Sequence, residues 1–142
     1  SRIEQREMAK YYKLIRDVKK VLPISKEINR AIIETYEYLQ TIPTEKGRQK
    51  HLKAVEKGLK EQYTPRMKKL SFSQGKLLIK LVDRQTHSTS YELVKAFMGP
   101  FKAGFYQTFA ALFGASLKKQ YDPTGDDALT ERVILMVESG QL

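Results

Sequence analysis

The stretch SFSQGKLLIKLVDR, Ser71 to Arg84, decides the fold class of this chain. Ser71 and Gln74 form a capping box, in which each side chain accepts a hydrogen bond from the other residue's backbone N–H at a helix start. At ~100° per residue, the apolar residues that follow cover about half of the helix circumference. They are Leu77, Leu78, Ile79, Leu81 and Val82, with Lys76, Lys80, Asp83 and Arg84 on the other side. Since short apolar runs are ambiguous, the stretch predicts a helix with a strand through LLIKLV as the alternative.

Two apolar stripes at helical spacing lie near the start of the chain. The first runs from Met8 to Leu22 and the second from Ile24 to Ile42, with apolar residues recurring at intervals of three and four. Proline removes a backbone hydrogen bond and crowds the preceding turn, so Pro23 is expected to break or kink this run. Ser25 is then a candidate cap for the second helix.

A third helix is predicted to start at a corner formed by TIPTEKGRQK. Thr44 suits the N-cap position, and Glu45 in the first turn favours the helix dipole. The apolar stripe of this helix comprises Leu52, Val55, Leu59 and Tyr63. Pro65 is expected to end it.

The polar stretch VDRQTHSTSYELVK, which starts at Val82, is predicted to be a corner between two helices. Thr89 and Glu92 form a second capping box directly before an apolar run. Asp83 is expected to close the preceding helix on its polar side, facing water. The turn itself is expected at residues 85–88.

Two more helices are expected after the corner at Gly99 and Pro100. FKAGFYQTFAALFG, residues 101–114, has bulky aromatic residues on one face and small residues opposite, which suits a central helix with neighbours on both sides. The loop YDPTGDD then leads into a last helix. Asp126 or Asp127 is expected to be its N-cap, with the other acid favouring the helix dipole.

The sequence therefore predicts an all-α protein with about six or seven helices in a single compact domain, residues 1–142, since a chain of this length fits one domain. No repeat, low-complexity tract or linker divides it. Basic amphipathic helices in residues 1–70 are expected to pack on an aromatic-rich helical core in residues 71–142, where all 6 phenylalanines lie.

Positive charge is concentrated in the first half of the chain. The net charge is +10, and residues 1–70 hold 18 Lys and Arg against 9 Asp and Glu, whereas residues 71–142 hold 8 against 7. Such a field attracts anionic partners, among them nucleic acid, acidic lipids and polyanionic glycans. The candidate residues for this contact are Lys10, Lys13, Arg16, Lys19, Lys20, Arg48, Lys50, Lys53, Lys57 and Lys60.

Several classes of protein are excluded or disfavoured by composition. The absence of cysteine excludes disulfides, thiolate nucleophiles and cysteine-based zinc sites. Two separate histidines leave no zinc set, and His51 is expected to be solvated on a lysine-rich helix surface. No stretch approaches the ~20 apolar residues of a membrane span. The N-terminus is charged where a signal peptide has its apolar region. No cofactor is expected.

A Ser-His-Asp site is the sharpest catalytic hypothesis. Asp83, His87 and Ser88 or Ser90 offer the residue types. These residues share one local turn, however, and no Gly-x-Ser-x-Gly elbow is present. The interpretation of these residues as a corner between two helices is therefore preferred. An uncharacterised hydrolase is an alternative.

Calcium binding is a weaker metal hypothesis. Asp122, Thr124, Asp126 and Asp127 offer oxygen ligands. The loop does not follow the EF-hand pattern, because its glycine is misplaced and its twelfth residue is Val133 instead of Glu. A turn followed by a helix cap explains the same acids.

The residues between Ser71 and Glu131 resemble a family of unknown function that occurs in Gram-negative bacteria of the Bacteroides group. The resemblance rests on SQGKLLIKLVDRQT, TSYELVK, the aromatic spacing before LFG, LKKQYDP and GDD, and it extends less sharply over residues 1–65. It implies a precursor with an N-terminal export signal, so that this chain would be the mature, envelope-side part. It implies no activity, cofactor or catalytic residue. Gln85 replaces a common acid and Tyr106 a common Trp, which puts in doubt any chemistry that depends on that acid.

These observations predict a non-catalytic, exported helical protein of the cell envelope, periplasmic or envelope-associated, that presents a basic surface to an anionic or protein partner. The alternative is a cytoplasmic nucleic-acid-binding protein, in which lysines neutralise phosphates and Tyr11 or Tyr12 stacks on bases. No known DNA-reading signature supports that alternative.

Overall fold

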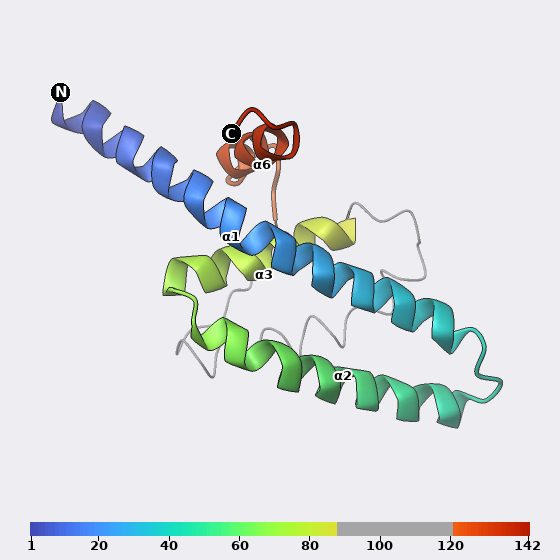
Figure 1. Cartoon of the computed structure of the whole chain (residues 1–142). Coiled ribbons are helices and arrows are strands. Elements are labelled where there is room, and N and C mark those ends of the chain that lie inside the picture. The colour runs from blue at the N-terminus through green and yellow to red at the C-terminus, as the bar shows by residue number, and fades with distance from the viewer. Residues whose placement is uncertain (88–120) are drawn as a thin grey trace.

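Figure 1 shows the computed structural model of the chain, which describes residues 1–87 and 121–142. Four helices lie in these two ranges: α1 (Arg2–Leu39), α2 (Glu45–Lys68), α3 (Phe72–His87) and α6 (Ala128–Glu138). No strand occurs within them. The all-α prediction is confirmed, and LLIKLV is helical. Four helices are present in the described ranges, against the six or seven predicted for the whole chain.

The longest helix, α1, is the common support of the other three. It contacts α3 most extensively, and α6 and α2 less so. In Figure 1, α2 returns beneath the second half of α1, α3 passes behind its middle, and α6 lies beside its first half. The N-terminal turns of α1 project past the other helices, and residues 1–10 are all exposed. No helix in the described part of the chain is both long enough and apolar enough to span a bilayer.

Pro23 does not break the first helix, so the break expected there is wrong: α1, 38 residues long, continues through the proline. The proline ring is exposed, whereas Val21, Leu22 and Ile24 around it are buried. A proline inside a helix costs about 3 kcal/mol, and burying each aliphatic side chain contributes about 1.5–3 kcal/mol. Burial on both sides of the proline therefore outweighs its cost. Ser25 is not a cap; it is buried, and its hydroxyl donates to the Leu22 carbonyl at 2.7 Å.

Pro65 does not end the third predicted helix either, because α2 extends to Lys68. Tyr63 and Met67 on either side of the proline are buried in the core. The same segment is tied to α1, since Arg66 donates to Oε2 of Glu27 at 2.7 Å. This bond holds the pKa of the Glu27 carboxyl below its ordinary value. The turn of the chain into α3 consequently comes at residues 69–71.

The core of the described residues is aliphatic. Its fully buried members include Ile28 and Ile32 from α1, Leu78 and Leu81 from α3, and Ile134 from α6. Tyr63 and Tyr121 are the aromatic members among the described residues. Phe72 is 49% exposed, and the other five phenylalanines lie outside the described residues. The predicted aromatic-rich core is therefore not shown by this part of the structure.

The capping box that starts α3 is present as expected. The Ser71 N–H donates to Oε1 of Gln74 at 3.1 Å, and the Gln74 N–H donates to the Ser71 hydroxyl at 3.2 Å. Thr44 caps α2, accepting from the Gly47 N–H at 3.1 Å. The second predicted box, Thr89 and Glu92, lies outside the described residues.

One other boundary differs from the predictions. Helix α3 runs on to His87, so residues 85–87 are helical where a turn was expected. Of the two acids predicted for the N-cap of α6, Asp127 takes that position and Asp126 does not, but the Asp127 side chain makes no capping bond. Its carboxylate is engaged elsewhere, because it accepts hydrogen bonds from Nζ of Lys80 and from the Asp122 N–H.

Candidate functional site

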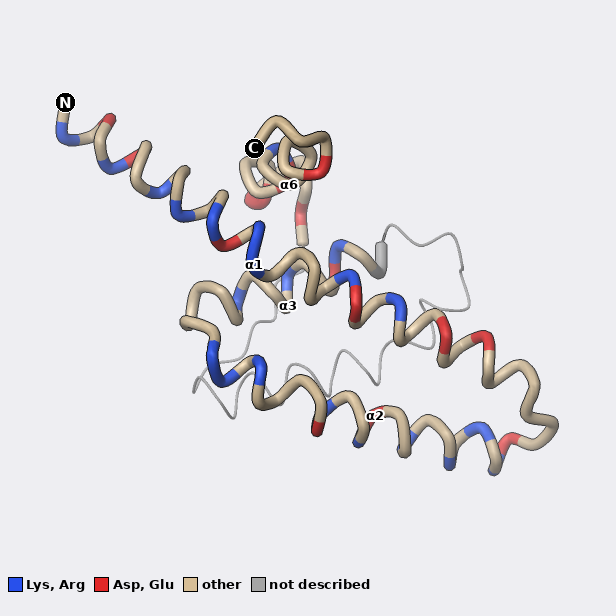
Figure 2. Tube along the Cα trace, viewed as in Figure 1, with Lys and Arg blue, Asp and Glu red and all other residues tan. Residues whose placement is uncertain are grey.

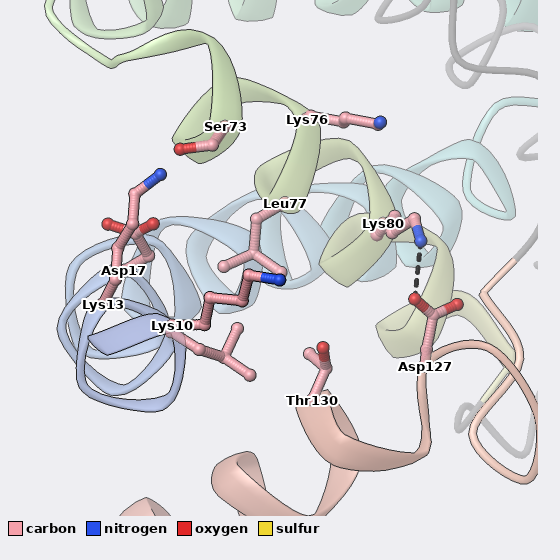
Figure 3. Close-up of a pocket in the computed structure, with 10 residues that line it drawn as sticks. Lys10, Lys13, Asp17, Ser73, Lys76, Leu77, Lys80, Asp127 and Thr130 are labelled. Atoms are coloured by element: carbon pink, nitrogen blue, oxygen red, sulfur yellow. Dashed lines mark hydrogen bonds and ion pairs between the residues drawn. The ribbon is translucent and has the colours of Figure 1, made fainter. Parts of the chain in front are cut away.

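A pocket of about 330 Å³ lies where α1, α3 and the start of α6 meet (Figure 3). Its walls carry more lysine than any other residue type: Lys10 and Lys13 from α1, and Lys76 and Lys80 from α3. Asp17 and Asp127 are the acids among the lining residues. Four lysines and two aspartates give the described lining a formal charge of +2.

Helical spacing explains why these side chains converge. Lys10, Lys13 and Asp17 are separated by three and four residues, and such residues share one face of a helix. Lys76 and Lys80 are likewise four residues apart on the polar face of α3. The crossing of α1 and α3 turns the two faces toward each other, and the α6 N-terminus closes the third side (Figure 3).

One lysine of the pocket is neutralised. Nζ of Lys80 lies 2.5 Å from Oδ1 of Asp127, and these side chains are only 19% and 5% exposed. An ion pair held this far from water depends on good geometry, and removing one partner leaves a buried charge. The pair therefore serves as a fixed wall of the pocket that links α3 to the start of α6.

The other acid of the pocket is held by α3 as well. Asp17 is buried, and its Oδ1 accepts from Nε2 of Gln74 at 3.0 Å. Gln74 thus bonds α1 with its nitrogen and caps α3 with its oxygen. This contact fixes the distance between the lysines of α1 and those of α3.

The remaining lysines present their charge to solvent. Lys10 is 76% exposed, and its contact with Glu7 is long, at 3.8 Å, between two exposed side chains. Lys13 and Lys76 are exposed, and neither makes an ion pair with any residue in ranges 1–87 and 121–142. Figure 3 shows the Lys10 and Lys13 amines extending from α1 toward α3.

A second polar cluster, behind the pocket, fixes α6 on α3. Nε and Nη2 of Arg84 donate to the two carboxylate oxygens of Glu131 at 2.7 and 2.9 Å, and the Tyr121 hydroxyl donates to Oε1 at 3.0 Å. The Arg84 guanidinium holds the pKa of Glu131 below its ordinary value and has its own pKa raised in turn. Burial, and then the nearby Glu131 charge, raise the pKa of Tyr121. These bonds give the cluster a structural role.

Asp83 does not face water, so that prediction is wrong. It is only 2% exposed, and its Oδ2 accepts from the Tyr121 N–H at 2.8 Å. This hydrogen bond therefore anchors the segment that enters α6 to α3. His87 is the last residue of α3, and Ser88 and Ser90 lie outside the described residues. The structure thus gives Asp83 an anchoring contact and does not place a Ser-His-Asp set.

The calcium candidates are used within their own loop. Oδ1 of Asp122 accepts from the Thr124 N–H at 3.3 Å, and Oδ2 of Asp127 accepts from the Asp122 N–H at 2.9 Å. Asp126 is exposed. Across the described residues, no three His, Asp or Glu side chains gather closely enough to hold a metal ion.

The ten predicted basic residues divide between two helices. Lys10 and Lys13 line the pocket, whereas Arg16, Lys19 and Lys20 are exposed farther along α1. Arg48 bonds Glu45 and the Ile42 carbonyl. The four predicted lysines of α2, which are Lys50, Lys53, Lys57 and Lys60, are all exposed. Figure 2 shows the positive residues along both helices, so the structure does not join all ten into one site.

Two further features of α2 bear on the predictions. Lys57 and Lys60 line a second, open depression of about 510 Å³ that also includes Glu61 and Pro65. The ring centroid of His51 lies 4.5 Å from that of Tyr38. His51 is partly buried, whereas the sequence predicts a solvated side chain.

Lys76 and Lys80 line the pocket but are not among the residues that the sequence predicts for the site. Their spacing of four on the polar face of a predicted helix was visible, but their meeting with Lys10 and Lys13 depends on how α1 crosses α3. Arg2 and Arg6 were also missed; they continue the Lys10 and Lys13 face toward the N-terminus at helical spacing. Both are exposed.

Comparison with known proteins gives one match. The family model described as "Domain of unknown function (DUF4294)" matches residues 2–136. No curated protein matches the chain. No solved structure matches it.

Proposed function

Since the chain belongs to the DUF4294 family, a family of unknown function, we propose from its geometry that the protein is a non-catalytic binding module for an anionic partner. The proposed contact surface consists of Lys10, Lys13 and Lys76 around the pocket, with Arg2 and Arg6 extending it along α1. We call these five residues the basic surface.

The observation that carries this proposal is the convergence of solvent-facing lysines from two separate helices. Lys13 and Lys76 have no ion-pair partner in the described residues, and Lys10 has only a long contact. Lysines on an ordinary helix surface repel one another and spread apart. Here the Gln74–Asp17 bond joins α1 to α3 and so holds the two sets of lysines together, and the Lys80–Asp127 pair joins α3 to the start of α6. A preorganised positive site reduces the cost of binding an anion.

The same geometry argues for binding instead of catalysis. Both acids of the pocket already accept hydrogen bonds from α3 side chains. Asp83, the acid of the catalytic hypothesis, is buried, and its carboxylate accepts a hydrogen bond from the Tyr121 N–H. The groups that the described residues offer to a ligand are therefore amines and hydroxyls, which attract and orient anions.

The proposal includes the location. We place the protein in the cell envelope, as an exported, periplasmic or envelope-associated chain from a bacterium of the Bacteroides group. This part rests on the sequence motifs between Ser71 and Glu131. An envelope is rich in anionic glycans and lipids, which suits a surface of exposed lysines. Cell fractionation of the native host, with detection in the cytoplasm alone, would contradict it.

The binding proposal is tested with the full chain and dextran sulfate, a soluble polyanion. We expect an affinity whose log-log dependence on salt falls by about one unit for each lysine contact removed, as for polyanions with condensed counterions. Lys13→Gln and Lys76→Gln are expected to lower both affinity and slope. Lys50→Gln and Lys53→Gln on α2 make the same charge change away from the pocket and are the matched controls.

Two outcomes would contradict the proposal. One is the absence of dextran sulfate binding at low salt. The other is an equal loss of affinity from the pocket and the α2 variants, which would show only net charge. Duplex DNA is titrated in parallel: binding much tighter than to dextran sulfate at matched charge would favour the nucleic-acid alternative.

A further inference from the structure

We infer that the pocket between α1, α3 and the start of α6 is a subsite for a phosphomonoester, the dianionic phosphate that ends a phosphorylated sugar or a lipid headgroup. This inference rests on the proposed function and specifies which anionic group the basic surface selects. The charge of the pocket, its hydrogen-bond donors and its shape support this inference.

The charge of the pocket matches a dianion. Lys80 and Asp127 neutralise each other at 2.5 Å, so they contribute no net field at short range. Lys10, Lys13 and Lys76 then face Asp17 as the one remaining acid of the described lining. The balance is two positive charges. A phosphomonoester carries about −1.5 to −2 at pH 7, whereas a phosphodiester carries one charge.

The donors surround the pocket on all three of its walls. Lysine amines extend from α1 and α3, and the hydroxyls of Ser73 and Thr130 line the walls formed by α3 and α6 (Figure 3). A phosphomonoester has three terminal oxygens that each accept strong hydrogen bonds. Lysine binds phosphate as a point charge with three rotatable donors, so the site needs no bidentate arginine.

The pocket has room for the group that carries the phosphate. Its volume of about 330 Å³ falls at the small end of the ~300–1,000 Å³ range for ligand sites. Leu77 and the partly buried Leu14 supply an apolar contact beside the amines. The carbon atoms next to a phosphomonoester fit this arrangement, with the charged end among the lysines.

The preference for a monoester separates this site from a nucleic-acid contact. The backbone of nucleic acid is made of diesters with one charge each, which would leave one positive charge of the pocket unmatched. The same reasoning disfavours diester phospholipids and favours those with a terminal phosphate.

The experiment compares two small probes with the full-length chain. Methyl phosphate and dimethyl phosphate are titrated separately, and binding is followed by the NMR signals of the Lys13 and Lys76 amides and of the lysine amines. Above pH 7 we expect methyl phosphate to bind about fivefold more tightly, because the second charge interacts with several partly exposed amines. Its affinity should fall as pH decreases through about 6, where the phosphomonoester dianion takes up a proton and becomes a monoanion.

Variants test which lysines produce the preference for methyl phosphate over dimethyl phosphate. Lys76→Gln and Lys13→Gln should each bring the two probes close to equal affinity, and Lys76→Arg should retain the preference. Lys53→Gln, which lowers the net charge equally, should leave it unchanged. Circular dichroism of each variant verifies that the helices are intact. Equal affinity of the unmodified protein for both probes would overturn the inference, as would an equal effect of Lys53→Gln.

A vesicle assay separates the sources of the phosphomonoester. Neutral lipid vesicles are doped with phosphatidic acid, a monoester, or with phosphatidylglycerol, a diester, at matched surface charge. Selective binding to phosphatidic acid supports a lipid headgroup. Binding to soluble methyl phosphate with no vesicle selectivity supports a soluble or glycan-borne phosphate. If dextran sulfate binds through the basic surface but the probes show no difference, the subsite inference fails and the proposed function stands. If dextran sulfate does not bind either, both fail.

Discussion

The backbone N–H of Tyr121 donates to Oδ2 of Asp83 across 2.8 Å, joining α3 to the segment that enters α6. The two residues are separated by 38 positions in the chain. Because Asp83 is buried, its carboxylate replaces water as the partner of this amide. The contact explains why a polar residue lies on the inner side of α3, and it positions the Asp127 and Thr130 wall of the pocket.

Replacing Asp83 should destabilise the fold without any bound ligand. Asp83→Ala leaves the buried Tyr121 N–H without its acceptor, which typically costs about 1–3 kcal/mol. Urea denaturation followed by circular dichroism measures the loss in unfolding free energy. Glu56→Ala, an exposed acid on α2, is the matched control and should change stability by less than about 0.5 kcal/mol. Similar stabilities of the two variants would refute the anchoring role.

The Arg84–Glu131 pair should show strong coupling in a double-mutant cycle. The bidentate bonds are shielded, with side chains 16% and 20% exposed. We expect a coupling energy of about 1–2 kcal/mol for Arg84→Met combined with Glu131→Gln, measured from unfolding free energies. The exposed Arg48–Glu45 pair, 2.9 Å apart, is the comparison and should couple much less. A coupling near zero for Arg84 and Glu131 would contradict the view that this pair holds α6 in place.

Stability should fall in acid through Glu131. The Arg84 guanidinium lowers the pKa of this carboxyl below its ordinary value of 4.5. A group with a lowered folded-state pKa contributes stability that is fully present above the unfolded-state pKa and is lost as pH falls through the folded-state pKa. Unfolding free energy should therefore decrease below about pH 4.5, and Glu131→Gln should flatten part of that decrease. An unchanged pH profile in the variant would exclude Glu131 as a contributor.

Pro23→Ala should stabilise the protein. The substitution restores a backbone donor in the middle of α1, and the exposed ring leaves no cavity in the core when it is removed. The gain in helix propensity exceeds the added entropy of the unfolded chain, so we expect about 1–2 kcal/mol of stabilisation in thermal or urea unfolding. The converse control is Ala9→Pro. Ala9 lies in the exposed N-terminal part of α1, so this substitution should destabilise the helix only locally. A loss of stability in Pro23→Ala would show that the core requires a proline-induced bend.

Local patterns predicted the starts of α2 and α3 correctly, but not the continuation of α1 through Pro23 or of α2 past Pro65. The Ser71–Gln74 box and the Thr44 cap depend on residues three apart, and both are present. The burial that keeps α1 continuous through Pro23 depends on other helices, which the spacing within α1 does not reveal. The burial of Asp83 is equally hidden from local spacing, because its partner is a backbone amide 38 positions away.

The candidate site was predictable only in part. The sequence indicates Lys10 and Lys13 as candidates for the anionic contact, but it indicates Lys57 and Lys60 on α2 equally. The feature that separates the two sets is the approach of Lys76 and Lys80, and this depends on the crossing of α1 and α3 (Figure 3). Such a crossing is set by packing of Leu78, Ile28 and their neighbours, which sequence spacing does not specify.

The most direct test of the account is a map of where a polyanion binds. A short dextran sulfate oligosaccharide is added to the isotopically labelled full chain, and backbone amide shifts are recorded along the sequence. The largest changes are expected at residues 10–17 of α1 and 73–80 of α3, the two walls of the pocket. Changes centred instead on residues 46–60 of α2, with none at Lys13 or Lys76, would contradict the central claim that the crossing of α1 and α3 creates the binding site.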